Sequence, residues 1–239
     1  MRHSLIAQSI GFLLLYTLMI NSAFSKNIDN QLLINQLEEL LNQRKDNLLK
    51  ELFLKKSFNQ FNKQYLTFRK KYTDAKWSIN SSRNDQDKSL LDIKIISKRE
   101  INNKIYNLNT KQTVKLETYK NKIKKYEVIN EESILNSQNS PLIVRVISPD
   151  KVLTGEKYEM NLIIENPLEN SLTASGMIVL KNEDNKKISN AIFGIKPNQS
   201  GGLFKYIQAP LTPGSQTISA IITHPDGIYL ITKKIKVGL

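Results

Sequence analysis

The chain has 239 residues and a formal net charge of +13, from 35 Lys and Arg against 22 Asp and Glu, and it contains no cysteine. The lack of cysteine excludes a cysteine nucleophile, disulfide bonds and thiolate metal sites. Only two histidines occur, His3 and His224, so we expect no transition-metal site and predict neither a metal nor a cofactor.

The first 25 residues have the three parts of a secretory signal peptide. Arg2 supplies a positive start, an apolar run covers residues 10–20, and the small residues Ala23 and Ser25 precede Lys26. We therefore expect cleavage near Ser25 and an extracytoplasmic location, either periplasmic or secreted. The alternative is that residues 10–20 remain as an uncleaved anchor and hold the protein at the membrane, although the run is shorter than the ~20 residues of a membrane-spanning helix.

Glycine and proline indicate a division of the chain near residue 140. Neither residue occurs between positions 12 and 140, and all seven prolines lie at or beyond Pro141. Residues 137–140 are short and polar, which predicts a linker. We expect two domains that fold independently, residues 26–136 and 141–239.

Residues 29–73 have the pattern of helices. Asp29 or Asn30 is expected to cap the first helix, and Asp46 a second one. Steps of four and three then place six large side chains on one helical face: Leu54, Phe58, Phe61, Tyr65, Phe68 and Tyr72. Such a stripe is typical of a face that packs into a core. The alternative, a coiled-coil dimer seam, suits aromatic side chains poorly.

Residues 75–135 predict an antiparallel β-meander. The segments "AKWSI", "LLDIKIIS", "NKIYNL", "QTVKLETY" and "KIKKYEVI" are rich in β-branched and aromatic residues, and the asparagines of "INNK", "NLNT" and "YKNK" are expected in the turns. The acids Asp74, Glu100 and Glu127 flank these strands, where we expect solvated turn positions. Helices followed by a meander predict an α+β domain with the aromatic stripe packed on its sheet.

This order of elements over residues 30–135 resembles the cone-shaped fold of the nuclear-transport-factor-two-like superfamily. That superfamily contains both enzymes and binding domains, so the resemblance transfers no function to this chain. Its enzymes commonly place Asp, His or Tyr inside the cone, and this domain has no histidine.

Residues 141–239 predict about seven short strands separated by turns, which is typical of an all-β immunoglobulin-like sandwich. The segment "KYEMNLIIE" alternates cleanly, and the connector "ENPLENSLT" ends it at Pro167, which cannot sit in a central strand. "HPDG", from His224 to Gly227, predicts a tight hairpin turn with the histidine side chain exposed to solvent.

The same region resembles the C-terminal immunoglobulin-like modules of transglutaminases and related bacterial domains. The resemblance rests on "GE" before a strand, "NPL" with a later "LT", and a "PL" turn followed by glycine: Gly155, Glu156, Asn166, Pro167, Leu168, Leu172, Thr173, Pro210, Leu211 and Gly214. In that family these residues are structural. Because the transglutaminase core is missing, the resemblance implies no acyl transfer.

The positive charge gives the remaining candidates for a binding site. Basic residues cluster in three segments of the first domain, and we expect them to bind an anionic partner: Arg69, Lys70, Lys71, Lys98, Arg99, Lys122, Lys124 and Lys125. Export makes nucleic acid an improbable partner, which leaves an envelope protein or an anionic lipid or glycan. The alternative is a solvated lysine-rich surface with no dedicated partner.

No phosphate loop, dinucleotide-binding turn or nucleophile elbow occurs, so the first hypothesis is a non-enzymatic envelope protein that acts in binding or as an adaptor. The second is a small-ligand carrier or enzyme with its site inside the cone. A deep apolar cavity with a buried acid would favour the second hypothesis, and a cone filled by the aromatic stripe would exclude it. A structural spacer without a ligand is the third hypothesis, and the sequence does not indicate an oligomeric state.

Overall fold

The computed structural model describes residues 31–82, 89–166, 172–180, 193–198 and 201–238. The expected signal peptide, the expected caps Asp29 and Asn30, and Pro167 lie outside these ranges. The described part of the chain begins with helices and continues as a mostly antiparallel β structure, so the coarse expectation of an α+β part followed by a β-rich part is confirmed. None of the described helices is long and apolar enough to cross a membrane.

The helical part contains a helix over residues 31–43, α2 (Asp46–Leu49), a short 3₁₀ turn (Lys50–Leu52) and α3 (Lys55–Lys71). The first helix buries Leu33, Ile34, Leu37 and Leu41, whose spacing places them on one face. Asp46 does not cap α2, contrary to expectation: Lys45 precedes the helix without a side-chain cap, and the Asp46 carboxylate accepts a hydrogen bond from the Tyr65 hydroxyl at 2.8 Å.

Twelve strands follow in the described part of the chain: β1 (Lys76–Ser82), β2 (Ser89–Ile101), β3 (Lys104–Tyr119), β4 (Lys122–Ser137), β5 (Val144–Ile147), β6 (Lys151–Leu153), β7 (Lys157–Ile164), β8 (Ala174–Leu180), β9 (Lys196–Pro197), β10 (Gly202–Gln208), β11 (Gly214–His224) and β12 (Gly227–Gly238). Nine of them form one sheet in the order β1-β2-β3-β4-β12-β11-β8-β9, with β6 added beside β12, and β10-β7-β5 form a second sheet.

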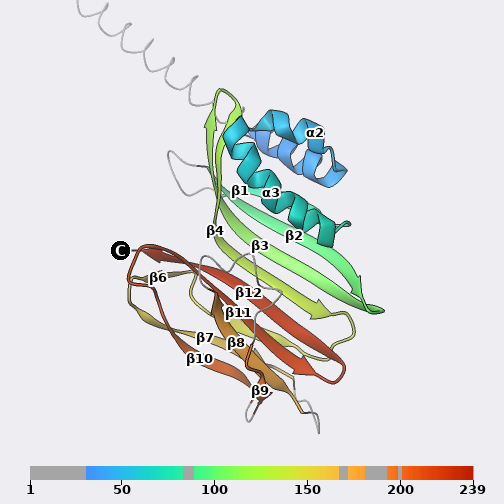
Figure 1. Cartoon of the computed structure of the whole chain (residues 1–239), viewed down its shortest axis with the longest axis vertical. Coiled ribbons are helices and arrows are strands. Elements are labelled where there is room, and N and C mark those ends of the chain that lie inside the picture. Colours follow the sequence, from blue (N-terminus) through green and yellow to red (C-terminus); the bar gives the residue numbers. More distant parts are fainter. Residues whose placement is uncertain (1–30, 83–88, 167–171, 181–192, 199–200, 239) are drawn as a thin grey trace, which may run out of the picture.

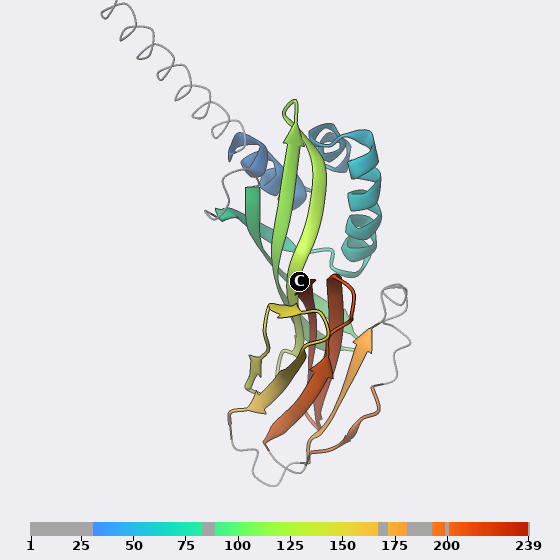
Figure 2. The ribbon, with the colours of Figure 1, turned by 90° about the vertical axis from the view of Figure 1, so that its left-hand side faces the viewer.

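The large sheet runs through both halves of the molecule, as Figure 1 shows. The helices cover one face of the β1–β4 end, and the small sheet packs on the other half (Figure 2). The junction is the antiparallel pair β4–β12, which extends from Tyr229 opposite Asn136 to Lys234 opposite Glu131. The expected linker therefore begins inside a strand, because β4 ends at Ser137.

The β-meander turns on asparagine, as predicted for two of the three segments. Asn102 and Asn103 (φ 51° and 60°) join β2 to β3, and Asn121 follows Lys120 (φ 56° and 48°) between β3 and β4. Asparagine tolerates this left-handed conformation better than other residues with a side chain beyond Cβ. The prediction for "NLNT" was wrong, because these residues lie inside β3, which is one long strand rather than two short ones.

Two separate cores stabilise the two halves. The first is formed by the helices and the β1–β4 end of the large sheet, and it includes Leu37, Trp77 and Ile93. The second lies between the small sheet and the β12-β11-β8 end of the large one, and it includes Met160 and Ile218. Each core contains residues from one half of the chain, apart from Ile134 of β4, which packs against the second core.

A buried lysine connects the halves beside the β4–β12 pair. Lys233 of β12, only 7% exposed at its side chain, lies 2.9 Å from Asp150 and 3.5 Å from Glu132 of β4. Its ammonium also donates a hydrogen bond to the carbonyl of Ser148 at 3.1 Å. These contacts give the buried charge the partners that it needs.

Candidate functional site

The eight basic residues expected to bind an anionic partner do not form one patch. Five lie around the C-terminal end of α3: Arg69, Lys70, Lys71, Lys98 and Arg99. The other three begin β4 beside the N-terminal end of α3, where Ser57 donates a hydrogen bond to the Lys124 carbonyl: Lys122, Lys124 and Lys125. The helix has 17 residues, which places about 25 Å between the two groups.

Arg69 is directed into the protein instead of toward a partner. Its guanidinium donates to the carbonyl of Ala75 at 3.2 Å and to the carbonyl of Leu41, and Nε donates to the Tyr65 hydroxyl at 3.2 Å. The guanidinium carbon also lies 4.2 Å from the centroid of the Trp77 ring, within the range of a cation–π interaction. Arg69 thus connects α3, the first helix and the start of the sheet.

A cavity of about 290 Å³ lies between α3 and the sheet. It is lined by Leu41, Phe61, Gln64, Tyr65, Phe68, Tyr72, Trp77, Ile95, Leu108, Thr110, Gln112, Tyr126, Val128, Glu131 and Ser133. The aromatic stripe of α3 therefore packs on its own sheet, as expected, but leaves a space beneath it. Of the stripe residues within α3 only Tyr65 is fully buried, and Phe58, Phe61 and Phe68 are half-buried.

Six aromatic rings form the roof and walls of this cavity, and they hold one another in place. Phe61 stacks on Tyr65 at a centroid distance of 5.5 Å and meets Tyr126 edge-on at 5.1 Å. Phe68 meets Trp77 edge-on at 5.7 Å. Such offset and edge-to-face pairs are the arrangements that aromatic rings prefer, so the wall is ordered before any ligand is present.

The floor of the cavity is polar. On β3 and β4, Thr110 and Ser133 are cross-strand partners whose hydroxyls hydrogen-bond at 2.8 Å. In the next row, Gln112 donates to the carboxylate of Glu131 at 2.8 Å. A helix that simply packs on a sheet buries apolar residues at these positions, because polar groups cost free energy when they leave water. The polar floor therefore distinguishes this space from a packing defect.

The tyrosines of the cavity stay neutral at physiological pH. Burial raises the pKa of Tyr126, and the negative charge of Glu131 raises it further. Burial also raises the pKa of Tyr65 and of Tyr72, while Arg69 and Arg99 respectively oppose the increase. The phenol rings therefore offer uncharged hydroxyls and electron-rich faces to a ligand.

Among the described residues that line the cavity, Glu131 is the one carboxylate, and it accepts a hydrogen bond from the amide of Gln112. Across the part of the chain that the structure describes, no group of three or more His, Cys, Asp and Glu is placed to hold a metal ion.

The sequence analysis did not single out the floor residues Thr110, Gln112, Glu131 and Ser133. The sequence "LNTKQTV" contained a signal for them. Every second residue of this strand lies on one face, and on that face the polar Thr110 and Gln112 stand between the apolar Leu108 and Val114. Of the three acids expected in solvated turns, Asp74 does lie exposed in the turn before β1, where it also accepts hydrogen bonds from the Ser97 hydroxyl and from the Lys98 N–H at 3.2 Å. Glu100 and Glu127 are exposed too, but they lie within β2 and β4 and not in turns.

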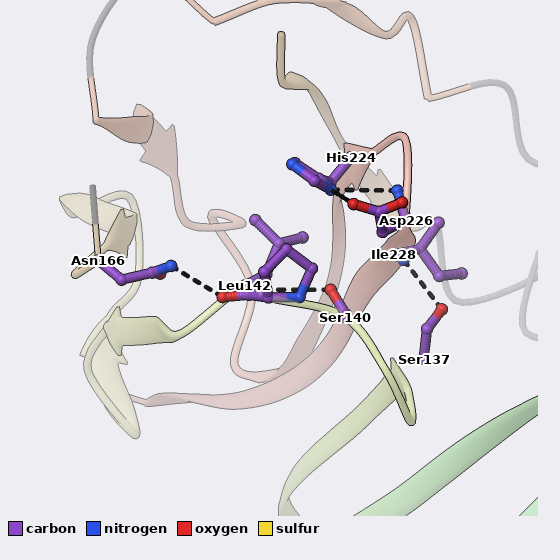
Figure 3. A network of polar contacts seen from close by, with 8 residues as sticks. Ser137, Ser140, Leu142, Asn166, His224, Asp226 and Ile228 are labelled. Carbon is purple, nitrogen blue, oxygen red and sulfur yellow. Dashed lines mark hydrogen bonds and ion pairs between the residues drawn. The ribbon is translucent and has the colours of Figure 1, made fainter. Parts of the chain in front are cut away.

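The histidine of "HPDG" was expected to be exposed, and this was wrong. The predicted hairpin is present, with His224 paired to Gly227 across a two-residue turn. The His224 side chain is only 4% exposed, and its Nδ1 accepts a hydrogen bond at 3.1 Å from the N–H of Asp226 in the tight turn (Figure 3). The ring thus satisfies a backbone donor of the turn.

The segment after β4 is tied to the C-terminal half by hydrogen bonds, which Figure 3 shows. The N–H of Ile228 donates to the Ser137 hydroxyl at 3.0 Å, and the N–H of Leu142 donates to Ser140 at 3.3 Å. Asn166 donates to the carbonyl of Pro141 at 2.8 Å. A Cβ on Gly227 would lie 2.7 Å from Ser137, so only glycine fits at the start of β12.

The comparison with protein families matches residues 139–238 to the family described as Domain of unknown function (DUF8623). The match covers less than half of the chain and includes the second core, but not the cavity under α3. The search of the curated proteins finds no match to this chain.

Proposed function

We propose that this protein binds a small, largely apolar molecule in the cavity beneath α3. The observation that carries the proposal is the combination of six aromatic rings above a polar floor in a partly open space of about 290 Å³. Mostly apolar pockets with a few directed polar groups are the usual form of small-molecule sites. We further propose a binding role without catalysis, and its support is that Glu131 accepts its hydrogen bond from the amide of Gln112, a group that does not titrate.

The proposal agrees with the resemblance of residues 30–135 to the nuclear-transport-factor-two-like cone. Its support is the layout: helices come first, a strongly twisted antiparallel sheet follows, and the cavity lies between them. We likewise propose that residues 141–239 form an immunoglobulin-like sandwich. Here the support is the pairing, in which β5 and β10 flank β7, β8 and β12 flank β11, and β6 joins β12 in parallel.

Trp77 makes the proposal testable without a label, because it is the one tryptophan of the chain and lines the cavity. Residues 26–239 are titrated with cyclohexanol and 1-hexanol while tryptophan fluorescence and the unfolding midpoint are followed. We expect a saturable fluorescence change and a midpoint that rises with ligand concentration.

A matched pair of variants identifies the site. Thr110→Phe fills the cavity and should abolish the response, whereas Asn109→Phe places the same ring on the opposite, exposed face of β3 and should retain it. A response that is equal in both variants, or no saturable response of the wild-type protein to either alcohol, contradicts the proposal.

A second candidate function, that of an adaptor, is favoured by aromatic residues on the outer face of the small sheet. Tyr206 and Phe204 of β10 are 78% and 51% exposed, and the register places Phe204 in one row with Ile147 of β5, which is 47% exposed. Exposed apolar residues that adjoin in this way often mark protein contacts. A pull-down from an envelope fraction at high salt should retain a protein identifiable by mass spectrometry, and Phe204→Ser with Tyr206→Ser should lose it.

We also propose that the protein acts outside the cytoplasm, in the periplasm or after secretion, and the support is the sequence of residues 1–25. Mass determination of the protein from its producing cells should give a chain that begins at Lys26. A chain that retains residues 10–20 would instead support a membrane anchor.

A further inference from the structure

The charged side chains that line the cavity differ in sign from the net charge of the whole chain. The protein carries a net charge of +13, yet no lysine or arginine occurs among the described residues that line the cavity, and Glu131 is its one carboxylate. One oxygen of Glu131 accepts the hydrogen bond from Gln112, and the other has no donor among the described residues. A half-buried carboxylate with a free oxygen favours a ligand that carries positive charge.

The aromatic walls have the same preference. The face of an aromatic ring is electron-rich, and a cation within about 6 Å of its centroid is attracted to it. Two arginines of this chain already use the attraction: the guanidinium of Arg69 lies 4.2 Å from Trp77, and that of Arg99 lies 5.9 Å from Tyr72. Cages of aromatic rings are a known means of holding a quaternary ammonium group.

The neighbouring charges leave the carboxylate available. Lys234 is the cross-strand partner of Glu131, but its ammonium donates to the carbonyl of Val128, and no ion pair to Glu131 occurs in the described chain. Arg69 donates to the Tyr65 hydroxyl, which donates in turn to the Asp46 carboxylate, so a carboxylate lies one hydroxyl away from this guanidinium. Arg99 is partly exposed, where solvent and salt screen it.

We infer that the cavity selects a small organic cation, an alkylated ammonium group, with the aromatic rings around it and the Glu131 carboxylate as its counter-charge. The inference rests on the proposed function and narrows it to one chemical class. The volume of about 290 Å³ fits a head group with a short chain.

The test compares two molecules of the same shape, choline and its uncharged carbon analogue 3,3-dimethylbutan-1-ol, by calorimetry on residues 26–239. We expect choline to bind about tenfold more tightly or better, which corresponds to a cation–π and counter-charge advantage of the usual size. The advantage should decrease as salt is added.

Equal affinities would overturn the inference and leave the proposed function intact, because the cavity would then bind by shape alone. Binding of neither compound would also overturn it, and the separate titration with cyclohexanol and 1-hexanol then decides whether the cavity binds any ligand.

A variant pair assigns the counter-charge. Glu131→Gln keeps the shape and removes the charge, so it should weaken choline binding several-fold and bring the affinity for choline close to that for 3,3-dimethylbutan-1-ol, while circular dichroism checks that the variant is folded. Glu127→Gln, at an exposed position of β4 whose carboxylate pairs with Lys125 at 2.8 Å, serves as the control and should not alter either affinity. Unchanged choline binding by Glu131→Gln would contradict the assigned role.

Discussion

Arg69 lies on α3 with its guanidinium turned toward the sheet, between the carbonyls of Leu41 and Ala75 and the ring of Trp77. The planar guanidinium satisfies acceptors on two different segments while its face rests on an aromatic ring, a combination that lysine cannot supply. One residue thereby fixes the helices against β1.

Replacement of Arg69 by methionine should lower the free energy of unfolding by about 2–3 kcal/mol, because two carbonyls lose their donor and the contact with Trp77 is lost. Urea unfolding measures the change. Lys70→Met is the matched control: Lys70 is exposed at the next position, and its loss should cost less than about 0.5 kcal/mol. Similar losses in both variants would contradict the internal role of Arg69.

Asp74 gives the fold a dependence on pH. Burial tends to raise its pKa, but the hydrogen bonds from the Ser97 hydroxyl and the Lys98 N–H outweigh this effect and lower the pKa below its ordinary value of 3.8. A carboxylate whose pKa is lower in the folded than in the unfolded state stabilises the fold above the unfolded pKa. This contribution is lost as the pH falls through the folded pKa.

We therefore expect Asp74→Asn to reduce the free energy of unfolding at pH 7 by about 0.5–1 kcal/mol, a value that allows for solvent screening. The difference from the wild-type protein should shrink between about pH 4 and pH 2. Urea unfolding at a series of pH values checks this. Asp92→Asn, at an exposed carboxylate whose hydrogen bond from Thr113 is long at 3.4 Å, is the control and should show no such trend.

At the scale of elements, the two asparagine turns determine the register of the longest strands. Asn102 and Asn103 close β2 on β3 with both residues in the left-handed conformation, as a two-residue hairpin turn of this type requires. The turn that joins two strands determines the register in which they pair.

Asn103→Val should lower the unfolding midpoint, because a β-branched residue costs about 1–2 kcal/mol in the left-handed region. Asn103→Gly should keep or raise the midpoint, since Asn-Gly is a favoured pair for this turn. Differential scanning calorimetry measures both. Lys104→Val, one residue later in the strand, is the control, and an equal loss there would show that the effect is not specific to the turn.

The type of each long element could be predicted from the sequence, because helical spacing in α3 and alternation in β2 are local patterns. The polar residues inside β3 could not be assigned in this way: Asn107 and Asn109 resemble turn residues, and only the pairing with β4 shows that they belong to a continuous strand. The residues of the cavity floor could not be predicted from the sequence for the same reason. Gln112 and Glu131 are 19 residues apart, and their meeting depends on strand register, which one sequence does not reveal.

At the scale of the whole molecule, the two halves have separate cores but share one sheet. The sequence indicated the division by its glycines and prolines. The pairing of β4 with β12, about a hundred residues apart, is a contact between distant segments that local patterns do not encode. Independent folding of the two halves stays a prediction, and the separate cores support it.

Residues 141–239 expressed alone should therefore unfold cooperatively, but with a free energy of unfolding lower than in the whole chain. The isolated part loses the β4–β12 hydrogen bonds and the packing of Ile134, which together are worth roughly 2–4 kcal/mol. Chemical unfolding of both chains, with the C-terminal half followed by NMR, measures the difference. Lack of a cooperative transition in the isolated part would contradict the division.

The position of β12 also has a consequence for how this module can be carried from one protein to another. The family match begins at residue 139, immediately after β4. The matched region therefore contains β12 but lacks β4, the strand that pairs with β12 along this edge. An open strand edge invites association with other chains. Any protein that inherits residues 139–238 must therefore bring a covering strand from elsewhere or use the edge to recruit a partner, and here β4 of the N-terminal half supplies that strand.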